Sequence, residues 1–191
     1  MSAPAQTKSR LQFLLIALVF LGPLIVAAWL YFQGEALQPR ARTNHGALLE
    51  PIVNLNDELP GSPIHAHSDQ NWLLIYAQTG PCEEPCRDAL YTIRQSRLML
   101  GREMDRLQRV FLHDVGTLDT VFVAEQHQGL ITIEDSSLAG LLNNKKPADL
   151  PAGGYFLVDP LGNLVMYFRP DLNPSEMVDD IKRLLRLSRI G

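Results

Sequence analysis

The chain contains two cysteines, Cys82 and Cys86, and three residues separate them. They belong to the stretch 79–86, which follows an apolar run and precedes a long helical pattern. Cysteine thiolates attack disulfides and bind soft metal ions. The positive end of a helix dipole favours the thiolate form of a cysteine. The position of the pair therefore predicts sulfur chemistry: thiol–disulfide exchange, or binding of Cu(I) with Cys82 and Cys86 as metal ligands.

The spacing of the two cysteines is compatible with a disulfide between them. Residues four apart on a helix share one face, so small adjustments would bring the two sulfurs together. A loop this short adds little stability to a domain of this size, which disfavours a purely structural bridge. Glu83 and Glu84 lie between the cysteines, and their negative charge opposes the thiolate form.

The elements that must position this pair can be predicted from the pattern of apolar residues. Residues 72–77 are a continuous apolar run typical of a strand buried on both faces. We expect a helix over residues 85–107, a strand over 109–113, short helical segments over 119–128 and 136–142, a hairpin formed by 155–158 and 164–168, and a closing helix over 174–188. This order predicts an α/β fold, a thioredoxin-like sandwich.

An apolar segment of twenty residues precedes this body, at 13–32, and it contains no charged side chain. A helix of that length rises about 30 Å, enough to cross a bilayer, so we expect a single transmembrane anchor there. A cleaved signal peptide is the competing interpretation, with Gly34–Glu35–Ala36 as its cleavage site, but its apolar core would be shorter. We expect residues 33–63 to form a tether and residues 64–191 to form the thioredoxin-like domain.

The charges around this segment predict its orientation. Lys8 and Arg10 precede it and no acidic residue does, which favours a cytoplasmic segment 1–12. The predicted location is the inner (cytoplasmic) membrane, crossed once, with the soluble domain on the exported, periplasmic side. Of 17 basic residues, 15 remain after these two, against 21 acidic ones, a formal net charge of −6. A mildly acidic exported body gives no reason to expect nucleic acid as a partner.

Two stretches carry a resemblance to a known family. Residues 72–86 lead from an apolar strand into Cys-x3-Cys, and residues 155–163 read Tyr-Phe-Leu-Val-Asp-Pro-Leu-Gly-Asn. With the N-terminal anchor, the chain resembles the Sco/SenC proteins, membrane-anchored thioredoxin-fold factors that help to assemble the copper centre of cytochrome c oxidase. The resemblance covers roughly residues 60 to 190. It implies a cytochrome c oxidase subunit or a copper-delivery protein as the partner.

The chain departs from this family at one position. The histidine that completes the copper site in Sco proteins corresponds to about Pro151, and no histidine follows His127. Proline there is instead similar to the cis-proline beside the redox cysteines of thioredoxins. We therefore predict Cys82, Cys86 and Pro151 as the catalytic residues of a thiol–disulfide exchange protein, with Cys82 attacking and Cys86 resolving.

Two other functions stay open. The chain could be a Cu(I) carrier without redox catalysis, with His113 or the pair His65 and His67 as further candidate ligands. It could also be a non-catalytic docking module that uses arginines of the 85–107 helix, among them Arg94 and Arg97, to contact a partner.

Overall fold

The structure is a computed structural model and describes residues 5–32 and 44–188. It divides into two compact units, residues 1–43 and 44–191. The first contains the helix α1 (Ala5–Phe32), which continues through Pro23. Among the described residues, no helix combines the length and the hydropathy that crossing a membrane requires.

The second unit is built on one six-stranded sheet with the strand order β1-β6-β5-β2-β3-β4. Its strands are β1 (Ala47–Asn54), β2 (Trp72–Gln78), β3 (Leu107–His113), β4 (Leu130–Glu134), β5 (Tyr155–Val158) and β6 (Asn163–Phe168). β2, β3 and β4 run parallel, whereas β5 is antiparallel to β2 and β6 is antiparallel to both β5 and β1. β2 therefore lies near the middle of the sheet and is covered on both faces.

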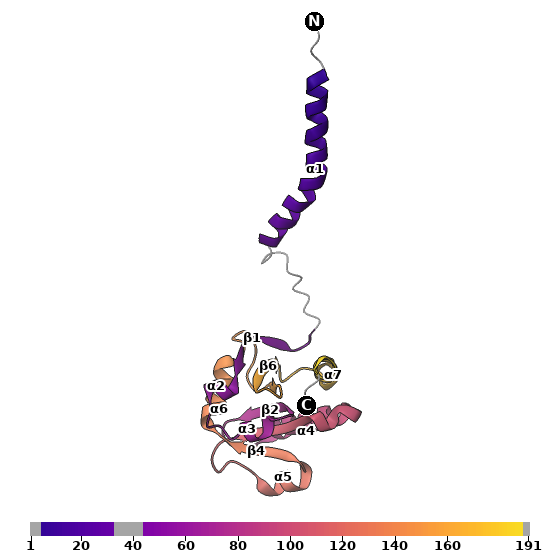
Figure 1. Ribbon diagram of the computed structural model, residues 1–191. Coiled ribbons are helices and arrows are strands. Elements are labelled where there is room, and N and C mark those ends of the chain that lie inside the picture. Colours follow the sequence, from indigo (N-terminus) through magenta and orange to yellow (C-terminus); the bar gives the residue numbers. More distant parts are fainter. Residues whose placement is uncertain (1–4, 33–43, 189–191) are drawn as a thin grey trace. The chain divides into compact units, whose positions relative to one another are not determined.

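Helices cover the two faces of the sheet and make a three-layer sandwich. The helices of this unit are α2 (Leu55–Glu58), α3 (His65–Ser68), α4 (Glu84–Met99), the 3-10 helix η1 (Gly101–Arg106), α5 (Thr120–Gln126), α6 (Ser136–Lys145) and α7 (Pro174–Leu187). Figure 1 shows α4 and α7 to the right of the strands and α2 and α6 to the left. Apolar side chains of α4 and α7 pack with Leu74 and Tyr76 of β2, and those of α2 and α6 pack with Leu73 and Ile75. The alternation of side chains along β2 therefore builds a core on each face.

The edge strand β1 corrects the predicted tether over residues 33–63. The folded unit begins at Asn44, because β1 pairs with β6 and Asp180 of α7 holds its start. The carboxylate oxygen Oδ2 of Asp180 accepts hydrogen bonds from the backbone N–H of His45 and of Gly46, each 2.8 Å long. The strand could not be predicted from the sequence for two reasons. Pro51 argued against a strand, although an edge strand tolerates proline, and the irregular register of β1 interrupts the alternation of its side chains.

Two further differences concern the crossover connections. The helix predicted over 85–107 ends at Met99, because Gly101 adopts a positive φ of 62° that stops an α-helix, and η1 leads into β3. The strand β4 was not predicted, because it is short and Ile133 is its one fully buried apolar residue. The remaining strands and α7 lie close to their predicted positions, and the thioredoxin-like fold is confirmed.

Candidate functional site

The two cysteines form a disulfide at the junction of β2 and α4. Their Cα atoms lie 5.1 Å apart, and Cys86 follows Cys82 by four positions in the sequence. Cys82 lies half-buried in the loop that follows β2, whereas Cys86 lies in the first turn of α4 with 1% of its surface exposed. Cys82 is therefore partly accessible to solvent, whereas Cys86 is enclosed by the core.

The sequence around Cys86 explains why α4 starts here. Glu83 is the N-cap residue in an extended conformation, and its carbonyl accepts the N–H of Arg87 at 3.0 Å. Pro85 fits the first turn, where the absence of an N–H costs nothing. The cap has no side-chain hydrogen bond to the helix. The partial positive charge of the helix start thus acts on Cys86, which is the sulfur that would leave as a thiolate when Cys82 is attacked.

The loop before Cys82 is tied to the neighbouring strand. Gly80 adopts a φ of 82°, which a residue with a side chain rarely adopts, and its N–H donates to Oδ2 of Asp114 at 2.9 Å. Asp114 directly follows β3, and Gln78 at the end of β2 pairs with His113 at the end of β3. The carboxyl ends of two parallel strands thus hold the loop that presents Cys82.

Aromatic residues lie in the core cluster that encloses Cys86. Tyr76 and Tyr155 are 3% and 2% exposed, and their ring centroids lie 5.9 Å apart. Burial, with a smaller contribution from Tyr155, raises the pKa of Tyr76 to about 12. Burial also raises the pKa of Tyr155, while a hydrogen bond to Thr92 opposes the shift. Both phenols thus stay neutral and protonated at physiological pH.

Pro151 lies in the loop between α6 and β5. Because Tyr155 pairs with Tyr76 in antiparallel register, this loop and the cysteine loop leave the sheet at the same edge. The carbonyl of Pro151 accepts the hydroxyl of Tyr167 at 2.5 Å, and that hydroxyl accepts the N–H of Gly154 at 3.0 Å. Among the described residues the cis peptide bond is Glu50–Pro51, so Leu150–Pro151 does not share the isomer of the thioredoxin proline. The catalytic role of Pro151 stays a prediction.

The structure does not assemble the histidines into a metal site. His65 and His67 lie on the short helix α3 rather than on a strand, and Nε2 of His65 is 2.6 Å from the carbonyl oxygen of Leu59. His113 is buried, and its Nδ1 lies 2.9 Å from the carbonyl oxygen of Asp114. Within the described part of the chain, no group of three or more His, Cys, Asp or Glu residues could hold a metal ion.

A cavity of about 490 Å³, which was not predicted, lies at the carboxyl end of β2 on the face of the sheet that α6 covers. Its lining includes Gln78, Thr79 and Asp114 on one side and Gly153, Gly154 and Lys146 on the other. Gly154 cannot carry a side chain, because a Cβ there would lie 2.0 Å from the carbonyl oxygen of Phe168. The pair Gly153–Gly154 before a strand was the available signal, since glycines often mark close backbone approach.

Comparison with known families agrees with this geometry. A family model described as transmembrane-like, thioredoxin-like, C-terminal domain matches residues 72–188, which is more than half of the chain. The chain belongs to this family. A second family model, described as transmembrane-like, N-terminal domain, matches residues 4–34 of this chain. No curated protein matches the chain.

Solved structures with the same fold include Sco proteins. Yeast Sco1 with copper bound aligns with a TM-score of 0.52 at 15% identity, covering 65% of this chain and 81% of that one. Arabidopsis thaliana ScoI with copper bound aligns with a TM-score of 0.51 at 15% identity, covering 65% of this chain and 89% of that one. At such identities the likeness shows that this family member shares the thioredoxin-like fold of the Sco proteins, which confirms the resemblance at the level of fold.

Proposed function

We propose that the chain is a membrane-anchored, Sco-like protein whose Cys82 and Cys86 carry out thiol–disulfide exchange with the cysteines of a cytochrome c oxidase subunit during assembly of the oxidase. The observation that carries this proposal is the asymmetry of the disulfide. Cys82 is half-buried in a loop, and Cys86 is enclosed at the start of α4. Thiol–disulfide exchange needs one accessible sulfur that meets the partner and a second sulfur within reach that resolves the mixed disulfide.

The exchange conserves atoms and electrons. The thiolate of reduced Cys82 attacks one sulfur of the partner's disulfide, which forms a mixed disulfide and releases the other partner sulfur as a thiolate. The thiolate of Cys86 then attacks Sγ of Cys82, so that the Cys82–Cys86 bond forms and the second partner sulfur leaves. The protons of the two thiols end on the partner's sulfurs. The disulfide in the structure is the product state, and an external dithiol would reset it.

The placement of the chain is part of the proposal. The transmembrane-like N-terminal domain at residues 4–34 supports membrane association. We propose a single span over residues 13–32, with residues 1–12 in the cytoplasm and the folded unit on the exported side, where disulfides persist. Lys8 and Arg10 before the span support this orientation.

A trapping experiment tests the exchange. The reduced full chain carrying Cys86→Ser is mixed with a synthetic peptide that contains the two copper-site cysteines of an oxidase subunit as a disulfide. We expect a stable mixed disulfide through Cys82, because the resolving thiol is absent. The Cys82→Ser chain is the matched control. Its mixed disulfide should form at least about tenfold more slowly than that of Cys86→Ser, because Cys86 is enclosed.

Equal trapping by the two variants would overturn the assignment of Cys82 as the attacking residue. Absence of a mixed disulfide with Cys86→Ser would overturn the exchange itself. Pro151→Ala adds a separate measurement: if Pro151 contacts the partner chain, this variant should slow trapping through Cys82 without changing the reaction of Cys82 with dithiothreitol.

A second candidate function is Cu(I) transport by the two thiolates. The observation in its favour is that Sco structures with the same fold contain copper. The described part of this chain offers two sulfurs and no third ligand group beside them. Two thiolates can hold a soft Cu(I) ion, but only after the disulfide has been reduced.

A further inference from the structure

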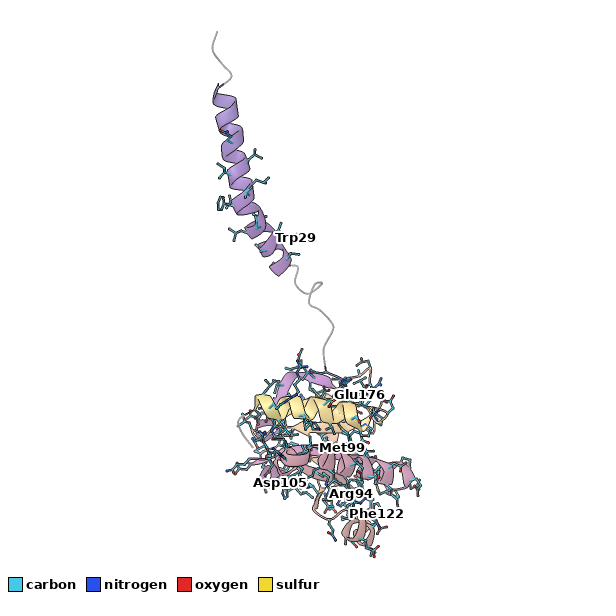
Figure 2. The ribbon with its side chains drawn as sticks, turned by 90° about the vertical axis from the view of Figure 1, so that its right-hand side faces the viewer. Trp29, Arg94, Met99, Asp105, Phe122 and Glu176 are labelled. Atoms are coloured by element: carbon cyan, nitrogen blue, oxygen red, sulfur yellow. A yellow bond between two sulfur atoms is a disulfide. The ribbon has the colours of Figure 1, made fainter. Side chains whose placement is uncertain are left out.

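A second cavity lies on another side of α4, away from the cysteines. It has a volume of about 370 Å³, within the range of small-ligand sites. Its lining comes from α4, β3 and the end of α5 with the turn that follows, and its polar residues are Arg94, Arg97, Arg109, Glu125, Gln126 and Gln128. In Figure 2, Arg94 is labelled on α4, and Phe122 marks the neighbouring α5.

Arg109 occupies a position that the strand pattern assigns to the core. It lies on β3 between Leu107 and Phe111, two buried residues of the same sheet face, and only 5% of Arg109 is exposed. Its Nη2 donates to the carbonyl oxygen of Gln128 at 2.7 Å. Its Nη1 is buried and has no hydrogen-bond partner among the residues that the structure describes. A guanidinium that is buried with an unused donor has lost hydration that a ligand could replace.

The neighbours of Arg109 increase the positive charge instead of balancing it. Burial lowers the pKa of Arg109, and the charges of Arg97 and Arg94 lower it further. Arg97 is partly engaged, since its Nε donates to the carbonyl oxygen of Leu107 at 2.8 Å and its Nη2 lies 3.3 Å from Oδ1 of the exposed Asp105. Burial, followed by the charges of Arg109 and Arg94, also lowers the pKa of the enclosed His127.

The charged residues of the lining define the ligand class. Three arginines against the single Glu125 leave a formal charge of +2 (3 − 1) around the cavity. Guanidinium groups present their donors in a fixed fork that matches oxyanions. An uncharged or cationic ligand would leave this positive charge uncompensated, whereas an oxyanion would balance what remains beyond the pairing of Arg97 with Asp105 outside the lining.

We propose that this cavity binds a multiply charged oxyanion of the phosphate class, with Arg94, Arg97 and Arg109 as the ligand-binding residues. Arg109 contributes a buried guanidinium with Nη1 as its unused donor, and Arg94 and Arg97 line the same cavity from α4. The site is independent of the cysteine chemistry, because its lining contains neither cysteine nor any residue of the loop that carries Cys82.

Calorimetric titration of the full chain in detergent micelles with inorganic phosphate tests the proposal. Ionic strength is held constant with sodium chloride, so that general screening does not change during the titration. We expect saturable binding with one site per chain. Arg94→Gln and Arg97→Gln should each weaken binding about tenfold or more, since each removes a charge-assisted donor. Neither variant changes Arg109. Because Arg97 also bonds to Leu107 and Asp105, urea unfolding of Arg97→Gln is compared with that of the unmodified chain, and Arg94→Gln carries the test if Arg97→Gln is destabilised.

The exposed Arg102 of η1 provides the matched control, because it lies outside the lining. Arg102→Gln should bind phosphate like the unmodified chain. The ring signals of His127, which packs 4.9 Å from Phe122, should shift on addition of phosphate and localise the site. Absence of saturable binding, equal losses in Arg94→Gln and Arg102→Gln, or equal affinities for acetate and phosphate would each overturn the proposal.

Discussion

The backbone N–H of Gly80 donates a 2.9 Å hydrogen bond to the carboxylate of Asp114, which ties the loop that carries Cys82 to the end of β3. Asp114 lies 34 positions further along the chain, and it also lines the cavity on the α6 face of the sheet. The position of the accessible sulfur is thus set by a residue of the neighbouring strand rather than by the cysteine stretch alone.

Removal of this acceptor should loosen the loop. We expect Asp114→Ala to lower the free energy of unfolding by roughly 1 to 3 kcal/mol, since the Gly80 N–H loses a charged partner. The disulfide should then be reduced faster by dithiothreitol, because Cys82 becomes more accessible. The measurement is the rate of reduction at fixed dithiothreitol concentration, with the exposed Asp149→Ala as control. Equal rates in the two variants would contradict the role of Asp114.

The buried Asp180 should be essential for the docking of β1. Asp180→Ala leaves the N–H groups of His45 and Gly46 without their acceptor, which we expect to cost about 2 to 4 kcal/mol of unfolding free energy. Urea unfolding measures the cost, and hydrogen exchange should show lost protection in β1. The adjacent Asp179 is exposed, so Asp179→Ala should change neither quantity. Retained protection of β1 in Asp180→Ala would refute this prediction.

Tyr76 should make the fold sensitive to alkali. Its folded-state pKa of about 12 lies above the ordinary value of 10.0, so the unfolded chain loses this proton first. Its contribution is therefore complete below pH 10 and falls as pH rises towards 12, by roughly 2 to 3 kcal/mol. Unfolding free energies across this window provide the measurement. Tyr76→Phe should flatten part of the decline, whereas the exposed Tyr91→Phe should not; identical profiles would show that burial of Tyr76 is not the cause.

Binding of Cu(I) should depend on the redox state of the cysteines. The reduced full chain should retain at most one Cu(I) per chain, because two thiolates make one soft site. The oxidised chain should retain none, since both sulfurs are then engaged in the disulfide. Metal content after gel filtration with a competing Cu(I) chelator measures retention, with Cys82→Ser and Cys86→Ser as controls. Retention by the oxidised chain, or undiminished retention by either variant, would contradict binding through the pair.

Local pattern was sufficient for much of the fold. The apolar run of β2, the hairpin of β5 and β6 and the amphipathic α7 were all predictable, because each has a continuous pattern of its own. The edge strand β1 and the short β4 were not, because Pro51 and a bulge interrupt the alternation in β1 and β4 has only one fully buried apolar residue. Pairing with β6 and the contact with Asp180 give β1 its structure, and neither interaction leaves a local signal.

The sequence by itself determined which residues of this protein can do sulfur chemistry and where they lie relative to a strand and a helix. Only the tertiary structure decided that Cys82 is accessible while Cys86 is enclosed, that Asp114 holds the cysteine loop, and that Arg109 lies buried beside Arg94 and Arg97. The physical reason is that residue type and spacing act along the chain, whereas burial and unbalanced charge depend on which distant segments pack together.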